Sequence, residues 1–100
     1  MEKLWRIRAE IEVEPGDLDL EPEYTKGFMN VVTWANSDQS AQKKLAEYLS
    51  TFNWKLLGVE ESGAMTDAFA PDSEVSEMVE RAKGNPRATI LGTFHSYREA

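Results

Sequence analysis

The first regular pattern along the chain lies in Leu4–Glu14, where apolar and charged residues alternate. A two-residue period places the two sets on opposite faces of a β-strand. The pattern therefore predicts a strand with one face against a core and the other in water. The apolar positions are Trp5, Ile7, Ala9, Ile11 and Val13, and the charged positions are Arg6, Arg8, Glu10, Glu12 and Glu14.

A second strand is predicted over Gly27–Ala35, which carries no charge. Its apolar residues fall on both faces, with Phe28, Val32 and Trp34 on one and Met29 and Val31 on the other. A strand of this kind belongs in the middle of a sheet, or under a further layer on each face. Residues 15–26, rich in acids and containing prolines, predict an exposed connection that is long for a hairpin.

Two segments have the spacing of amphipathic helices. The first begins at Asn36–Asp38, with Ser37 as its N-cap, and ends near Asn53. The second begins at Pro71–Ser73 and ends at Lys83–Pro86, where a cation, a glycine and a proline follow one another. Their apolar faces are Ala41, Leu45, Tyr48, Leu49 and Phe52 in the first, and Val75, Met78, Val79 and Ala82 in the second.

Two later strands are predicted at Trp54–Glu61 and Ala88–Tyr97, and Ser62–Gly63 reads as a tight turn. The stretches at residues 56–59 and 90–93 resemble each other, since each has two aliphatic residues before a glycine and each follows a helix. This likeness suggests two related halves. Ala64–Ala70 would then also be a strand, and residues 27–97 would read β-α-β-β-α-β.

This order predicts an α+β, ferredoxin-like (split βαβ) sandwich, with a mainly antiparallel sheet of four to five strands and both helices on one face. The strand at residues 4–14 is then an addition at an edge. A competing layout treats residues 62–72 as a loop and places the strand at 4–14 inside a four-stranded sheet. In both layouts, residues 1–100 form a single domain.

Composition narrows the functional classes. The 100 residues contain no cysteine, which excludes disulfides, thiol catalysis and zinc–thiolate sites. No signal peptide and no apolar run long enough to cross a bilayer is visible, so we expect a cytoplasmic protein without membrane association. The formal net charge of −7 disfavours nucleic-acid binding. The acidic segment Glu10–Glu23, which has no basic residue, suggests solvated surface, a basic protein partner or a cation site.

Motifs for catalysis or cofactor binding are sparse. The one histidine, His95, lies on the last predicted strand and is a candidate general base, but a metal site would need further ligands. Neither a phosphate-binding loop nor a dinucleotide fingerprint is present, so we expect no cofactor and no metal. Gly58 and Gly92 are interpreted structurally, as bulges or as places where Trp5, Trp34 or Trp54 crosses a strand.

Two helices on one face would leave the other face of the apolar strand at residues 27–35 uncovered. Such a patch needs a second subunit, a ligand or a covering segment of the chain. Face-to-face pairing of ferredoxin-like sheets is similar in architecture to the dimeric α/β-barrel proteins, some of which degrade haem with an asparagine, a tryptophan and a histidine. Asn30, Trp34 and His95 supply these residue types and are the candidate catalytic residues.

Three functional hypotheses follow. The first is a non-enzymatic protein–protein interaction domain, homodimeric and of the inhibitor or immunity type, with a basic protein as a further partner. The second is a dimeric α/β-barrel-type small-molecule-binding protein or enzyme that uses the open sheet face around His95. The third is a regulatory domain that binds a metabolite.

Overall fold

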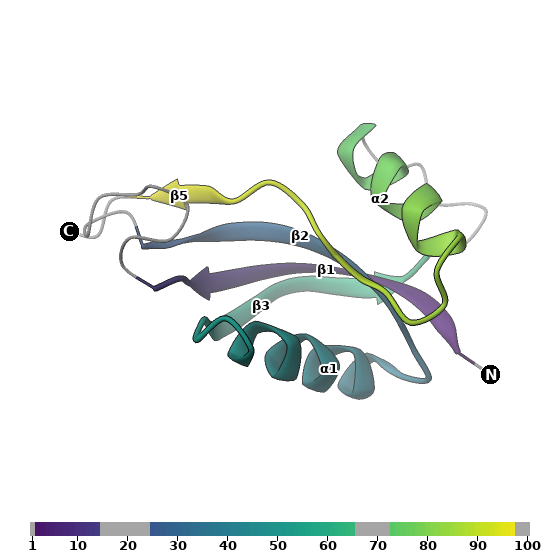
Figure 1. The fold of residues 1–100 in the computed structure, drawn as a ribbon, viewed down its shortest axis with the longest axis horizontal. Helices are drawn as coiled ribbons and strands as arrows, with labels where there is room; N and C mark the ends of the chain where they lie inside the picture. The colour runs from purple at the N-terminus through teal and green to yellow at the C-terminus, as the bar shows by residue number, and fades with distance from the viewer. Residues whose placement is uncertain (1, 15–24, 66–72, 98–100) are drawn as a thin grey trace.

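The computed structural model describes residues 2–14, 25–65 and 73–97, which form an α+β fold with a five-stranded antiparallel sheet and two helices (Figure 1). The strand order is β3-β1-β2-β4, and β5 also pairs with β2. In chain order the elements are β1 (Lys3–Glu12), β2 (Lys26–Ala35), α1 (Asp38–Ser50), β3 (Lys55–Ala64), α2 (Ser73–Lys83), β4 (Thr89–Leu91) and β5 (His95–Tyr97).

The alternating segment forms β1, and it lies in the interior of the sheet. It pairs with β2 over its whole length, from Lys3 opposite Ala35 to Glu12 opposite Lys26, and with β3 on its other side. The prediction that residues 4–14 are added at an edge is therefore wrong. The competing layout, which places this strand inside the sheet, is right in this respect. With β2 on one side and β3 on the other, the backbone N–H and C=O groups along both edges of β1 form hydrogen bonds.

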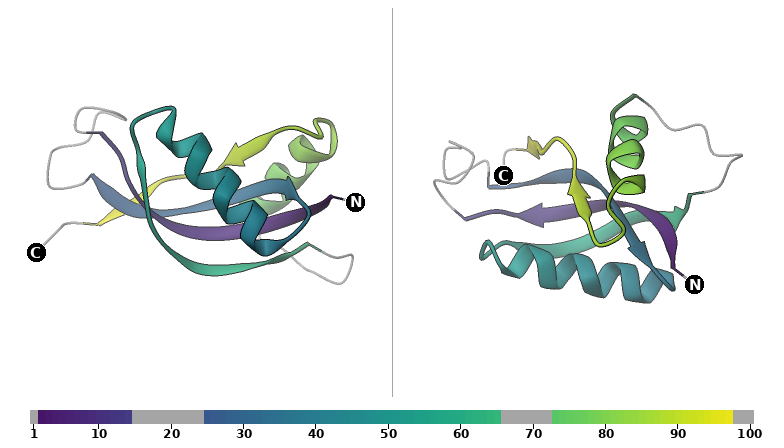
Figure 2. Two further views of the ribbon diagram at one scale, coloured as in Figure 1. Left: turned by 90° about the horizontal axis from the view of Figure 1, so that it is seen from below. Right: turned by 45° about the vertical axis from the view of Figure 1, so that its right-hand side comes forward.

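The two helices lie on opposite faces of the sheet, so the prediction that both cover one face is wrong (Figure 2). The split βαβ plan requires helices on one face and is not observed. The cause lies in β2, whose two apolar faces each need a cover. Met29 and Val31 pack in the cluster that contains α1, whereas Val32 and Trp34 pack in the cluster that contains α2. We call these the α1-side face and the α2-side face.

Helix α1 begins as its sequence predicts. Ser37 is the N-cap, and its hydroxyl accepts a hydrogen bond of 3.1 Å from the backbone N–H of Ser40. The helix ends at Ser50, and Asn53 then adopts a φ of 62°, a left-handed conformation in which a helix cannot continue. Phe52, predicted on the apolar helix face, therefore lies beyond the helix and is 39% exposed.

Strand β3 runs through the predicted turn at Ser62–Gly63, which is therefore not a turn. Pairing with β1 continues to Ala64, and the register shifts at two places, leaving Leu57 and Glu60 as extra residues in β3. Each shift is a β-bulge. The predicted strand at residues 64–70 lies outside the described residues, apart from Ala64 at the end of β3 and Met65 beyond it.

The final predicted strand is two short strands, β4 and β5, which pair with different parts of β2. They are separated at residues 92–94, where the N–H of Gly92 donates a 2.8 Å hydrogen bond to the carbonyl of Asn30. The prediction that a neighbouring side chain crosses Gly92 is right in kind, but Glu74 and Met78 of α2 lie there instead of a tryptophan. Gly58, by contrast, lies beside the bulge at Leu57.

None of the helices in the described part of the chain is long and apolar enough to cross a membrane.

Candidate functional site

Helix α2 covers only one end of the α2-side face. Its buried residues Val75, Met78 and Ala82 pack with Leu4 and Val32. The other end of this face, toward β5, lies beyond α2 (Figure 1). Polar and aromatic side chains gather there on four strands. We call this group the open surface and define it as Arg8, Glu10, Phe28, Glu60 and Tyr97.

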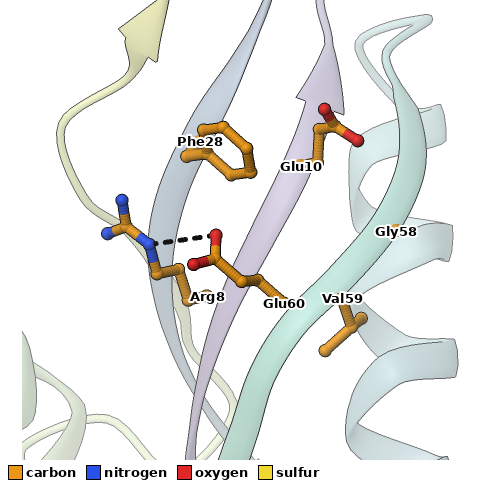
Figure 3. Close-up of a pocket in the computed structure, with 6 residues that line it drawn as sticks. All are labelled: Arg8, Glu10, Phe28, Gly58, Val59 and Glu60. Atoms are coloured by element: carbon orange, nitrogen blue, oxygen red, sulfur yellow. Dashed lines mark hydrogen bonds and ion pairs between the residues drawn. The ribbon is translucent and has the colours of Figure 1, made fainter.

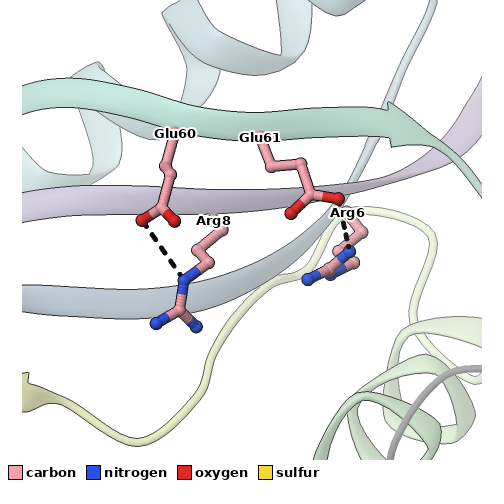
Figure 4. A network of polar contacts seen from close by, with 4 residues as sticks. All are labelled: Arg6, Arg8, Glu60 and Glu61. Carbon is pink, nitrogen blue, oxygen red and sulfur yellow. Dashed lines mark hydrogen bonds and ion pairs between the residues drawn. The ribbon is translucent and has the colours of Figure 1, made fainter.

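Two ion pairs connect β1 to β3 on this face (Figure 4). Arg8 Nε lies 3.4 Å from Glu60 Oε2, and Arg6 Nη1 lies 3.5 Å from Glu61 Oε1. Consecutive strand residues normally point to opposite faces, so Glu60 and Glu61 would not both meet arginines of one face. The bulge at Glu60 removes this restriction, because the extra residue changes the alternation of side chains in β3.

Aromatic contacts connect the same arginine to β2 and β5. The guanidinium carbon of Arg8 lies 5.6 Å from the centre of the Phe28 ring, in the range of a cation–π contact. The ring centre of Phe28 is 5.6 Å from that of Tyr97, and the Tyr97 hydroxyl donates a 2.6 Å hydrogen bond to Glu10 Oε2. Tyr97 therefore connects β5 to β1 across β2.

Four residues of the open surface, Arg8, Glu10, Phe28 and Glu60, line a hollow of about 470 Å³ that is open to solvent (Figure 3). The hollow exists because Gly58, directly opposite Glu10 in β3, has no side chain. A β-carbon on Gly58 would meet no atom within 4 Å. The residues that line the hollow are Arg8, Glu10, Phe28, Gly58, Val59 and Glu60.

The register leaves Glu10 without a cation directly opposite. Its neighbours across the strands are Phe28 in β2 and Gly58 in β3. Glu12, two residues further along β1, instead lies between Lys26 and Lys55. The hollow is thus the place on β1 where a carboxylate faces no basic residue across either ladder.

Asn30 lies beside this site in β2, directly opposite Arg8. The residue is only 5% exposed, and within the described residues its side-chain oxygen Oδ1 has no hydrogen-bond donor. A buried amide oxygen without a donor costs roughly 1–3 kcal/mol. Asn30 therefore places a buried hydrogen-bond acceptor without a described donor in the strand next to the site.

The structure does not bring the three candidate catalytic residues together. Asn30 and Trp34 share the α2-side face of β2, but four residues of extended strand separate them by roughly 13 Å. The Trp34 indole lies against α2 and donates a 2.8 Å hydrogen bond to the carbonyl of Ala82. His95 is exposed on β5, opposite Phe28.

Groups of at least three His, Cys, Asp or Glu residues arranged to hold a metal ion do not occur in the described residues. Of the acidic residues in the segment 10–23, only Glu10, Glu12 and the exposed Glu14 belong to the part of the chain that the structure describes. Two residues of the open surface, Glu60 and Tyr97, were missed at the sequence level. The signal for Glu60 is indirect, since Arg6 and Arg8 on one strand face favour acidic residues on a neighbouring strand.

Comparison with models of protein families, with curated proteins and with solved structures finds no match for this chain.

Proposed function

We propose that this chain is a non-enzymatic protein-interaction domain that binds a basic partner protein through the open surface. The observation that carries the proposal is the composition of that surface. Arginine, tyrosine and phenylalanine are enriched at protein interfaces; Arg8 and Phe28 line an open hollow, and Tyr97 packs against Phe28. A hollow open to solvent suits a protruding side chain of another protein better than a metabolite, which a binding pocket normally encloses.

Charge supports a basic partner. The chain has a formal net charge of −7, and this field attracts and orients a positively charged protein as it approaches. Within the open surface, the carboxylates of Glu10 and Glu60 outnumber the single guanidinium of Arg8. The interaction is therefore expected to weaken as salt is added.

A second copy of the chain is a less direct candidate. The apolar face of β2 that suggested a homodimer is covered by α2, at Val32 and Trp34, within the same chain. Strand β3 is at the end of the strand order among the described residues, and its ladder with β1 contains bulges at Leu57 and Glu60, which bend an edge strand and discourage edge-to-edge pairing. Homodimerisation stays a prediction, and sedimentation equilibrium of the full chain tests it.

The test of the proposed function begins with the immobilised full chain, which captures partners that moderate salt releases. A captured basic protein is then purified and titrated calorimetrically against the wild-type chain and against Glu10→Lys. We expect Glu10→Lys to weaken binding by about tenfold or more, because it places a like charge against the partner.

Glu47→Lys is the matched control, since it changes the net charge equally but lies exposed on α1, which packs on the opposite face. It should retain most of the affinity. An equal loss of affinity in the two variants would show that binding depends on net charge alone and would contradict recognition through the open surface. Failure of every captured protein to bind in purified form would overturn the proposed function.

A further inference from the structure

We propose that the hollow at Gly58 is a binding pocket for one arginine side chain of the partner. The inference rests on the proposed function, because it names the group on a basic protein that the open surface recognises. The guanidinium would lie over the space left by Gly58, between the carboxylates of Glu10 and Glu60 and near the Phe28 ring (Figure 3).

The hollow offers the groups that a guanidinium binds. Glu10 uses Oε2 to accept from Tyr97, and Glu60 uses Oε2 to contact Arg8. Within the described residues, the Oε1 atom of each carboxylate accepts no hydrogen bond, so both are available to donors from outside. A planar guanidinium has several N–H donors and pairs with carboxylates in well-defined geometry, whereas a lysine ammonium is a point charge.

Arg8 shows how this site holds a guanidinium. Its own group is placed over Phe28 and against Glu60, but the distance of 3.4 Å to Glu60 is long for a charge-assisted hydrogen bond. Asn30, opposite Arg8, contributes a buried Oδ1 without a donor in the described residues. Glu60 is therefore held by one long contact, and an incoming arginine can compete for its carboxylate.

The uncompensated charge selects for a cation. Glu10 faces Phe28 and Gly58 across its two ladders, so an arriving guanidinium supplies the cation that the register lacks. The space is also sufficient, since the hollow measures about 470 Å³ and a β-carbon on Gly58 would meet nothing within 4 Å.

The probe for this pocket is N-acetyl-arginine amide, titrated into the isotope-labelled full chain and followed by amide chemical shifts. N-acetyl-citrulline amide has the same shape without the charge and serves as the ligand control. We expect arginine amide to bind with a dissociation constant on the order of millimolar and to shift the amides of Glu10, Phe28 and Gly58. Citrulline amide should leave them unchanged. Equal shifts with both ligands, or shifts away from these residues, would overturn the pocket.

Two pairs of variants sharpen the test. Gly58→Leu fills the hollow and should abolish the shifts, whereas Gly63→Leu on the same strand should not, because its β-carbon also has open space. Glu10→Gln keeps an acceptor for Tyr97 and should weaken binding about tenfold. Glu12→Gln removes a charge already flanked by Lys26 and Lys55 and should have little effect. Thermal unfolding of each variant confirms that it is folded.

The pocket and the proposed function fail in different ways. A captured partner that binds Gly58→Leu as tightly as it binds the wild-type chain overturns the pocket and leaves the interaction domain in place. Binding of arginine amide in a chain that captures no protein supports the pocket and counts against the interaction domain.

Discussion

The indole N–H of Trp34 in β2 donates a 2.8 Å hydrogen bond to the carbonyl oxygen of Ala82 in α2. This contact joins the helix to the α2-side face of the sheet at the end where Leu4 and Val32 are buried. Ala82 lies in the last turn of α2, where its carbonyl also accepts a 3.0 Å hydrogen bond from the backbone N–H of Asn85, and the indole is a second donor to the same oxygen. Trp34 therefore contributes a hydrogen bond as well as apolar contact to the packing of α2.

Trp34→Phe should lower the free energy of unfolding by about 1 kcal/mol or more, because the hydrogen bond between the indole and the carbonyl of Ala82 is lost and packing is reduced. Amide hydrogen exchange should become faster in α2 and change little in α1, which packs on the other face. Denaturant unfolding and exchange measured by mass spectrometry check both expectations. Equal acceleration in the two helices would contradict a specific role of Trp34 at α2.

Gly27 is required for the close approach of β5 to β2. A β-carbon at this position would lie 2.5 Å from the carbonyl oxygen of His95 and 2.7 Å from the Cα of Ser96, both backbone atoms. Gly27→Ala should therefore destabilise the chain by roughly 1–3 kcal/mol, as expected for overpacking. Urea denaturation measures the effect.

The matched control is Gly63→Ala, where the added methyl group meets no atom within 4 Å. Its effect should stay within about 0.5 kcal/mol, the range of surface substitutions. Similar losses at Gly27 and Gly63 would indicate that the approach of β5 is less tight than described.

Asp38 connects the start of α1 to β3. Its Oδ1 accepts hydrogen bonds from Ser62 Oγ at 2.8 Å and from Gln42 Nε2 at 3.1 Å, and its charge lies in the first helical turn. Asp38→Ala should cost about 1–2 kcal/mol of stability. Gln39→Ala, an exposed change in the same turn, should cost less than about 0.5 kcal/mol. A double-mutant cycle with Ser62→Ala should give a coupling energy above zero, and strict additivity would contradict the contact.

Tyr97 secures the short strand β5 through its hydroxyl. Tyr97→Phe removes the hydrogen bond to Glu10 but keeps the ring against Phe28, so we expect a loss of about 1 kcal/mol. Exchange of the β5 amides should accelerate more than that of β1. Tyr48→Phe is the control, because the Tyr48 hydroxyl makes no hydrogen bond within the described residues. An equal loss in the two variants would argue against a specific contact with Glu10.

The open surface was only partly visible in the sequence. The alternation of β1 placed Arg8 and Glu10 on one face, and the pattern of β2 placed Phe28 and Asn30 together on one face. Glu60, the partner of Arg8, lies 52 residues further along the chain, and Tyr97, the partner of Glu10, lies 87 residues further along. The spacing of residues within one strand does not predict contacts between residues so far apart in the sequence.

Local sequence patterns by themselves determined β1, the apolar strand β2, the capped start of α1 and the end of α2. These features depend on contacts within a strand or a few helical turns. Tertiary structure alone decided that β1 lies inside the sheet, that the helices cover opposite faces and that Glu60 turns toward Arg8 through a bulge. A strand that is apolar on both faces must be packed against another layer on each side. Which segment forms each layer depends on contacts between residues far apart in the sequence. In this chain α1 packs on one face and α2 packs on the other.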